Sequence, residues 1–307
     1  MKRTLALTLC VLLACSTLAC GAPKTDASKP TVVATIFPQY DFIRAIAGDR
    51  VNLIMLAKPG GEVHGYDPSL SEMNLILASD LFVYVGGETD RWAKDLLEKN
   101  GKDLNAIALV DLVDTVDEEL APGMQGEAEE APETDEHVWT SPRNCIRIVE
   151  GLCDALCALL PEEADAMKAN AAAYISELTE LDGAFHDAVN NGKRKTVVFA
   201  ERFPFRYLCD ELGLRYYAAL PGCSSNEEVS LSTVSFLIDR VKAENLPCVF
   251  TIEFSDGRIA KTIADATGCE ILELHSCHNV SKADLDAGVT VLDLMRRNLQ
   301  SLKKAVN

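Results

Sequence analysis

The sequence predicts an α/β protein with two Rossmann-like lobes, each built on a parallel sheet, joined by one long rigid helix. Three observations carry this prediction. Short apolar runs typical of buried strands alternate with amphipathic helical patterns, this rhythm occurs twice along the chain, and a long uninterrupted helical pattern separates the two occurrences. Strands that are separated by helices pair in parallel, because a helix returns the chain to the same end of the sheet.

The N-terminal lobe is expected over residues 31–160. Its first strand is a β-branched run that ends at Pro38, and a helical pattern follows directly. Two further apolar runs repeat the motif. The expected elements are strands over 31–37, 51–56 and 81–85 and helices over 40–47 and 69–78.

The linking helix is expected over residues 161–192. Pro161 suits the first helical position, and Asn-Asn-Gly at 190–192 supplies a stop signal. The C-terminal lobe then covers residues 193–307. Its expected elements are strands over 196–200, 216–220, 248–252 and 270–274 and a final helix over 289–305. Two such lobes leave a cleft between them where loops from both can meet a ligand.

Residues 123–136 interrupt the pattern of the first lobe. This segment is rich in Glu, Gly, Ala and Pro and has almost no large apolar residue. It is expected to be a mobile surface loop.

The first thirty residues predict export and a lipid anchor. A charged start and an apolar stretch lead to Leu18-Ala19-Cys20-Gly21, which resembles the lipobox of bacterial lipoproteins. Residues 1–19 are then a signal peptide, Cys20 carries the lipid, and residues 20–30 form a polar tether. An ordinary signal peptide with an incidental cysteine is the alternative. The expected location is the extracytoplasmic face of the cell membrane.

The charge of the chain excludes one class of partner, and its cysteines leave disulfide bonds open. The formal net charge is −18, so nucleic acid is not an expected partner, because its binding needs clustered Lys and Arg. Eight of the 11 cysteines follow Cys20. An exported chain permits disulfides, but spacing alone does not select a pairing.

Four of the five histidines lie in loops or at the ends of strand-like runs: His64, His137, His275 and His278. The fifth, His186, lies in the linking helix and is expected to be exposed scaffold. Neutral imidazole beside carboxylate suits divalent transition metals, so the four loop histidines are candidate ligands. A lone loop histidine is more often an ordinary surface residue.

Two of these histidines lie in passages that resemble a known family. Residues 59–87, which contain His64, and residues 135–142, Asp-Glu-His-Val-Trp-Thr-Ser-Pro, are similar to the first two metal-binding segments of the zinc/manganese ABC transporter substrate-binding lipoproteins, the cluster A-I metal solute-binding family. Residues 220–230 and 251–268 extend the likeness over nearly all of the mature chain. The resemblance implies two α/β lobes bridged by a rigid helix, with metal held in the cleft.

The resemblance assigns His64 and His137 as the first two metal ligands. Glu62 and Asp67 flank His64, and either could orient it or act as an alternative ligand. The third position of the family falls at Arg202, which cannot coordinate a metal, so its neighbour Glu201 is the expected ligand. An ion pair with a neighbouring arginine is the alternative role for Glu201.

The fourth ligand departs from the family pattern, because Val289 stands where the family often has aspartate. His278 is the expected replacement. His275 is an alternative, and both histidines could instead cap the preceding strand or bond to the backbone. Glu253 matches a family glutamate that is expected to be structural.

The resemblance implies capture of a divalent metal, Zn²⁺ first and Mn²⁺ as the alternative, and its delivery to the membrane permease of an ABC importer by a monomeric protein. Two other functions stay open. A metal-dependent hydrolase would need an open coordination site, but the sequence has no H-E-x-x-H motif and no clear nucleophile and base, so the protein is not expected to be an enzyme. Adhesion to surface molecules, which is reported for some relatives, is the other alternative.

Overall fold

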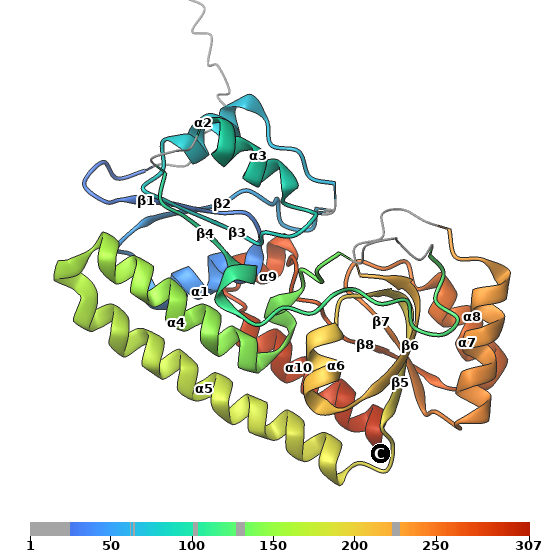
Figure 1. Cartoon of the computed structure of the whole chain (residues 1–307). Helices are drawn as coiled ribbons and strands as arrows, with labels where there is room; N and C mark the ends of the chain where they lie inside the picture. Colours follow the sequence, from blue (N-terminus) through green and yellow to red (C-terminus); the bar gives the residue numbers. More distant parts are fainter. Residues whose placement is uncertain (1–24, 62, 64, 101–103, 127–132, 223–227) are drawn as a thin grey trace, which may run out of the picture.

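The structure is a computed structural model that describes residues 25–61, 63, 65–100, 104–126, 133–222 and 228–307. Two α/β lobes lie side by side, each with a four-stranded parallel sheet (Figure 1). The predicted fold class is confirmed. The predicted signal peptide and Cys20 lie outside the described residues. Among the described residues, no helix is long and apolar enough to cross a membrane.

The first sheet has the strand order β2-β1-β3-β4. Its core strands are apolar because helices cover them: Val32, Val33 and Ala34 of β1 are fully buried. Its strands are β1 (Thr31–Ala34), β2 (Asn52–Met55), β3 (Leu81–Tyr84) and β4 (Ala106–Ala108), and its helices are α1 (Phe37–Ala47), α2 (Leu70–Leu77) and α3 (Arg91–Asn100). The three predicted strands and two predicted helices are present.

The second sheet repeats the same order as β6-β5-β7-β8. Its strands are β5 (Thr196–Phe203), β6 (Arg215–Pro221), β7 (Cys248–Thr251) and β8 (Glu270–Glu273). Its helices are α6 (Arg206–Leu212), α7 (Leu231–Ala243) and α8 (Arg258–Thr267). Because both sheets are parallel, the loops that follow their strands gather at one edge of each sheet.

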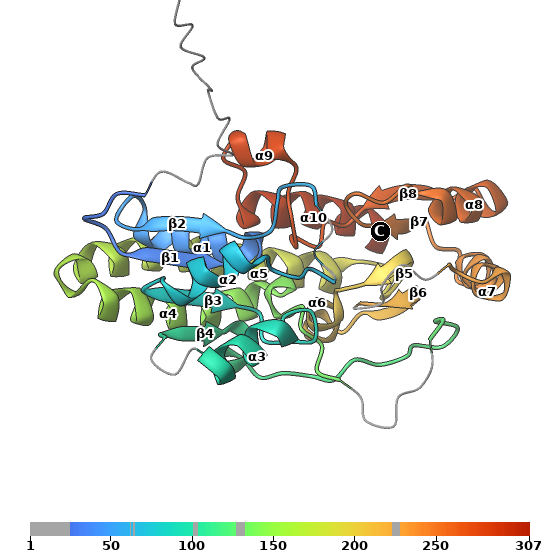
Figure 2. The same cartoon turned by 90° about the horizontal axis from the view of Figure 1, so that it is seen from above.

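The linking helix is α5 (Ala164–Asn191), 28 residues long, which at 1.5 Å per residue spans about 42 Å. It does not begin at Pro161 as predicted, because residues Pro161–Glu163 form a 3₁₀ turn that first closes α4 (Pro142–Leu159) against α5. The last two helices are α9 (Lys282–Asp286) and α10 (Val291–Val306). Since α10 contacts α5, α1, β5 and β8, it joins the two lobes a second time (Figures 1 and 2). The division of the chain into domains at residues 160 and 192 stays a prediction.

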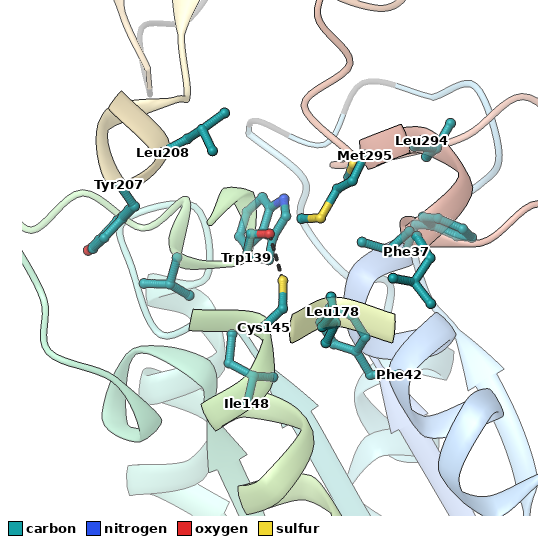
Figure 3. Packing of buried hydrophobic residues seen from close by; sticks show 14 of the residues in the cluster. Phe37, Phe42, Trp139, Cys145, Ile148, Leu178, Tyr207, Leu208, Leu294 and Met295 are labelled. Carbon is teal, nitrogen blue, oxygen red and sulfur yellow. Dashed lines mark hydrogen bonds between the residues drawn. The ribbon is translucent and has the colours of Figure 1, made fainter. Parts of the chain in front are cut away.

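One hydrophobic core runs through both lobes. Trp139, fully buried, lies at its centre between residues of the first lobe such as Phe37 and residues of the second lobe such as Leu208 (Figure 3). Its indole Nε1 donates a hydrogen bond to the carbonyl of Ser276, at 2.9 Å, in the loop after β8. The Sγ of Cys145 donates to the Trp139 carbonyl at 3.0 Å. The lobes are therefore packed together and are not merely tethered by α5.

A buried carboxylate reinforces this packing. Asp41 of α1 is fully buried and accepts hydrogen bonds from the backbone N of Val291, at 2.7 Å, and from the hydroxyl of Tyr174, at 3.0 Å. Burial raises its pKa, although the Val291 N–H and the Arg44 guanidinium oppose that rise. Asp41 thus ties α1 to both α5 and α10.

The prediction of a mobile surface loop over residues 123–136 is wrong for the C-terminal end of that segment. Asp135 and Glu136 are buried, with 2% and 0% of their surface exposed. They are buried because each finds donors: Glu136 accepts from the backbone N of Thr89, at 2.9 Å, and from the Thr89 hydroxyl. Gly87 makes room for this contact, since a Cβ there would lie 2.2 Å from the Glu136 Oε2.

Candidate metal centre

His137 is held in a fixed orientation by Asp135. It precedes the 3₁₀ turn Val138–Thr140 and is fully buried. One carboxylate oxygen of Asp135 accepts from the His137 backbone N at 2.8 Å and lies 3.0 Å from its Nδ1. The carboxylate therefore favours the tautomer with the proton on Nδ1, in which Nε2 is the nitrogen that carries the lone pair. Burial lowers the pKa of His137, but the Asp135 carboxylate opposes it, and the pKa is raised overall.

His278 approaches His137 from the second lobe. The two rings meet edge to face with centroids 5.7 Å apart, and the Trp139 ring lies 5.0 Å from that of His278. The loop that carries His278 is fastened by Glu253, whose carboxylate accepts from the backbone N of Ser276 at 2.7 Å and from its hydroxyl. Glu253 thus has the structural role that the sequence predicts.

Glu201 lies near the end of β5 and lines an open cavity of about 260 Å³ together with His278. Burial raises the pKa of Glu201, while a hydrogen bond from the Ser255 hydroxyl lowers it. Arg202 lines the same cavity. The structure therefore brings Glu201 and His278 to one cavity, and His278 to His137.

His275 has a different environment. Its Nδ1 accepts a hydrogen bond from the backbone N of Cys277 at 2.9 Å, which places the ring proton on Nε2 in the neutral form. Neither ring nitrogen then offers a lone pair to a metal. The backbone of His275 is also tied to Asn298, which accepts from its N and donates to its O at 2.7 Å each. This geometry favours a structural role for His275 and does not support it as the alternative ligand.

The predictions for Glu62 and His64 lie outside the described residues. Their neighbours Gly61 and Val63 line the cavity of Glu201 and His278. The second lobe holds the turn at residues 58–61 in place, since the Nδ2 of Asn279 donates to the carbonyls of Lys58 and Gly61 at 2.8 Å each.

Two carboxylates beside His137 were not predicted as part of the centre from the sequence. Ligand atoms of Glu118, Asp135 and His137 all lie within 4.8 Å of one another. Asp135 could have been found, because it lies two residues before His137. Glu118 gave no such signal, since an isolated antiparallel bridge between Asp117 and Thr134 brings its segment to the site. Asp67, a predicted orienting residue for His64, is exposed.

The C-terminal end of β6 closes the other side of His137. A Cβ on Gly222 would lie 2.8 Å from the His137 Cε1 and 3.0 Å from the Phe203 carbonyl. Only a residue without a side chain fits there without displacing the ring. Glycine at position 222 therefore makes room for the His137 ring in the candidate centre.

A second group of possible ligands lies at the junction of α5, α6 and α4: Asp182, His186 and Glu211. His186 is half-buried and not the exposed residue that the sequence predicts. Its Nε2 lies 3.2 Å from an Arg143 Nη2, and the Arg143 Nε lies 3.3 Å from a Glu211 oxygen. Since the guanidinium already supplies a positive charge, this group is a charge network between helices.

Known proteins resemble the chain over nearly its whole length. It is 30% identical over 309 residues to the zinc-binding lipoprotein AdcA of Streptococcus pneumoniae R6, covering 99% of this chain and 61% of AdcA. It is 27% identical over 308 residues to the high-affinity zinc uptake system protein ZnuA of Bacillus subtilis 168, covering 96% of each chain. The Zn(II)-bound ZnuA-like domain of S. pneumoniae AdcA superposes with a TM-score of 0.75 at 30% identity, covering 91% of this chain and 99% of that domain.

The chain spans less than two thirds of the length of the streptococcal relatives that it matches. The model of the family described as zinc-uptake complex component A, periplasmic, matches residues 32–305. A match of this extent takes in both lobes and every residue of the candidate centre. The chain therefore belongs to the ZnuA family of zinc-uptake components.

Proposed function

We propose that this protein captures a divalent transition metal outside the cytoplasm, with zinc as the first candidate and manganese as the second, and delivers it to the permease of an ABC importer. The observation that carries the proposal is the approach of His137 and His278 beside a cavity that Glu201 also lines. The proposed ligands are His64, His137, Glu201 and His278.

The spacing of the two imidazoles suits a shared ion. With Zn–N bonds near 2.0–2.1 Å and tetrahedral angles, two imidazoles on one zinc have ring centroids about 5 Å apart. The observed separation between His137 and His278 is 5.7 Å. Small rotations of the rings therefore bring both nitrogens to a common metal.

The ligand set decides between zinc and manganese. Three histidines with one glutamate favour Zn²⁺, whereas two histidines with two carboxylates favour Mn²⁺ or Fe²⁺. The carboxylate of Glu118 beside His137 is the residue that would shift this balance. The relatives AdcA and ZnuA are named for zinc, which supports zinc as the first candidate.

The membrane anchor and the role in transport belong to the same proposal. AdcA is named a lipoprotein, and Cys20 follows the small residues that a lipobox needs. Lipid on Cys20 would hold the protein at the extracytoplasmic face of the cell membrane. It would then meet the permease by diffusion in two dimensions. The proposed mature form is a monomer that binds metal without turnover.

The test is metal analysis of the purified protein followed by competition titration with a chelator. His137→Ala and His278→Ala should each lower zinc affinity by more than the ~10–100-fold that a residue behind a ligand contributes. His275→Ala is the matched control, and its affinity should stay close to that of the unchanged protein. Undiminished affinity in a His137→Ala, His278→Ala double variant would refute the proposed centre.

A further inference from the structure

The strand that carries Glu201 is irregular where it reaches the cavity. Phe199 of β5 pairs with Ala218 of β6, and Arg202 pairs with Leu220. In this stretch β5 therefore has one more residue than β6. Consecutive residues of a regular strand point to opposite faces of the sheet, yet Glu201 and Arg202 both line the cavity. The extra residue turns both side chains to the same side, as β-bulges do beside binding sites.

The hydroxyl of Ser255 holds Glu201 in this position. Ser255 lies in the turn between β7 and α8, and because β7 pairs with β5, this turn lies beside the end of β5 (Figure 1). The hydroxyl donates to the Oε1 of Glu201, and its oxygen accepts from the backbone N of Gly257 at 3.0 Å. A serine has a single hydroxyl proton, so this bond uses that proton and engages one of the two carboxylate oxygens.

A second hydroxyl, that of Thr251 on β7, contributes less. It donates to the carbonyl of Ile252 at 3.5 Å, and it opposes the rise in the pKa of Glu201 to a smaller extent than Ser255 does. Ser255 is therefore the main hydroxyl partner of Glu201.

The turn that contains Ser255 also holds the other proposed ligand of the second lobe. The hydroxyl of Ser276, which donates to Glu253, accepts from the backbone N of His278 at 3.2 Å. Phe254, between Glu253 and Ser255, has φ at +60°, a conformation that is rare for a bulky residue. Such strain persists only where the surrounding contacts fix the backbone. One turn of three residues thus fastens the supports of both ligands.

We propose that Ser255 is a positioning residue that holds Glu201 as a one-oxygen ligand and thereby sets the centre for Zn²⁺ over Mn²⁺. A carboxylate can bind a metal through one oxygen or through both. With Oε1 engaged by Ser255, Glu201 offers Oε2. This oxygen and the proposed ligands His64, His137 and His278 make four, the number that tetrahedral zinc takes. Manganese favours six ligands rich in oxygen, which a two-oxygen carboxylate would help to supply. This inference rests on the proposed function and names a residue that sets its selectivity.

The test compares Ser255→Ala with Ser255→Thr, which keeps the hydroxyl, in the full chain. Ser281→Ala is the matched control. The Ser281 hydroxyl likewise accepts from a backbone N and donates to a carboxylate, those of Asp284, at 3.0 and 2.6 Å, and Ser281 does not line the cavity. The control therefore removes a hydroxyl of the same kind without touching Glu201.

Competition titrations with Zn²⁺ and with Mn²⁺ measure the selectivity. Ser255→Ala should lower the ratio of zinc affinity to manganese affinity about 10–100-fold, because a partner behind a ligand contributes that much to the affinity of the metal whose geometry it supports. Ser255→Thr should restore the ratio. Ser281→Ala should have the ratio of the unchanged protein.

Cobalt(II) in place of zinc reports the coordination number directly, since its visible absorption is strong in four-coordinate sites and weak in six-coordinate ones. The unchanged protein and Ser255→Thr should absorb strongly. Ser255→Ala should absorb more weakly, because Glu201 can then bind through both oxygens. The spectra are recorded at saturating Co²⁺, so a loss of affinity alone leaves the intensity unchanged.

Three results would overturn the assignment of Ser255. If Ser255→Ala keeps both the affinity ratio and the cobalt spectrum, Ser255 does not position Glu201, although the proposed function stands. If Ser255→Ala lowers both affinities equally and leaves the cobalt spectrum unchanged, the hydroxyl only stabilises the turn. If the unchanged protein binds none of the three metals, the proposed function fails and the role of Ser255 fails with it.

Discussion

At the scale of single residues, the most informative contact is that between Asp135 and His137. The carboxylate accepts from both the backbone and the ring of His137, so one side chain sets the position and the tautomer of this proposed ligand. Metal-binding histidines commonly need such a partner, and its loss weakens the site without removing a ligand. We therefore expect the Asp135 carboxylate to increase the metal affinity of the proposed centre.

Asp135→Asn should lower zinc affinity about 10–100-fold, because the amide removes the negative charge that orients and polarises the imidazole. Competition titration measures the change. Asp67→Asn is the control, since Asp67 is exposed and was the orienting residue expected from the sequence. Equal losses in the two variants would contradict the assignment of Asp135.

Physical reasons explain which residues of the candidate centre the sequence indicated and which it did not. His137 was predicted from the likeness of residues 135–142 to a metal-binding segment and His278 from its place in the loop after a strand, and their rings lie close together. His275, three residues from His278, turns its Nδ1 to the backbone N of Cys277, and a sequence does not contain the direction of a ring. Glu118 reaches His137 through long-range pairing of two irregular segments, which leaves no periodic signal.

At the scale of elements, the predicted strands at the centres of the two sheets are the clearest in the sequence, because β1 and the first half of β5 are buried and rich in β-branched residues. β4 was missed because Ala106–Ala108 has only three residues, two of them alanine. The start of α5 was misplaced because Pro161 suits the first turn of a 3₁₀ helix as well as that of an α-helix. The long helix itself was predicted well, since helical residues continue through all of its turns.

Gly183 lies in α5, and a Cβ there would meet nothing within 4 Å. Gly183→Ala should therefore raise the free energy of unfolding by about 0.5–1 kcal/mol, because alanine restricts the unfolded chain and favours helix. Urea denaturation measures the gain, and zinc affinity should not change.

Gly268→Ala provides the contrasting control for that experiment. Gly268 ends α8 with φ at +77°, a conformation that strains any residue with a Cβ, so alanine should lower the free energy of unfolding by about 1 kcal/mol. A loss of stability in Gly183→Ala would show that α5 makes contacts at this position that the structure lacks.

At the scale of the whole molecule, the charge network at the junction of α4, α5 and α6 makes stability depend on pH. Burial and a contact with Asp182 raise the pKa of Glu211 from its ordinary 4.5 to about 7. The folded state then holds the proton more tightly than the unfolded state does, so stability falls as pH rises from about 4.5 to about 7.

Glu211→Gln should remove this dependence, because glutamine stays neutral and can still accept from the Ser141 hydroxyl. The variant should match the wild-type protein near pH 4.5 and exceed its free energy of unfolding by about 2 kcal/mol at pH 8. Urea titrations at both pH values, without metal, measure the difference. Glu98 is exposed, so Glu98→Gln is the control, and its free energy of unfolding should differ from that of the wild-type protein by the same amount at both pH values. The same constancy for Glu211→Gln would contradict the charge network.

The burial of Trp139 between the two lobes has an optical consequence. Its indole ring lies 5.5 Å from the ring of His137 and 5.0 Å from that of His278, while the second tryptophan, Trp92, packs on Tyr66 and Phe82 within the first lobe. A cation on the two imidazoles alters the electric field at one indole and leaves the other unaffected. The emission of Trp139 should therefore change when metal occupies the proposed centre, and a fluorescence titration with Zn²⁺ measures that change with no label attached.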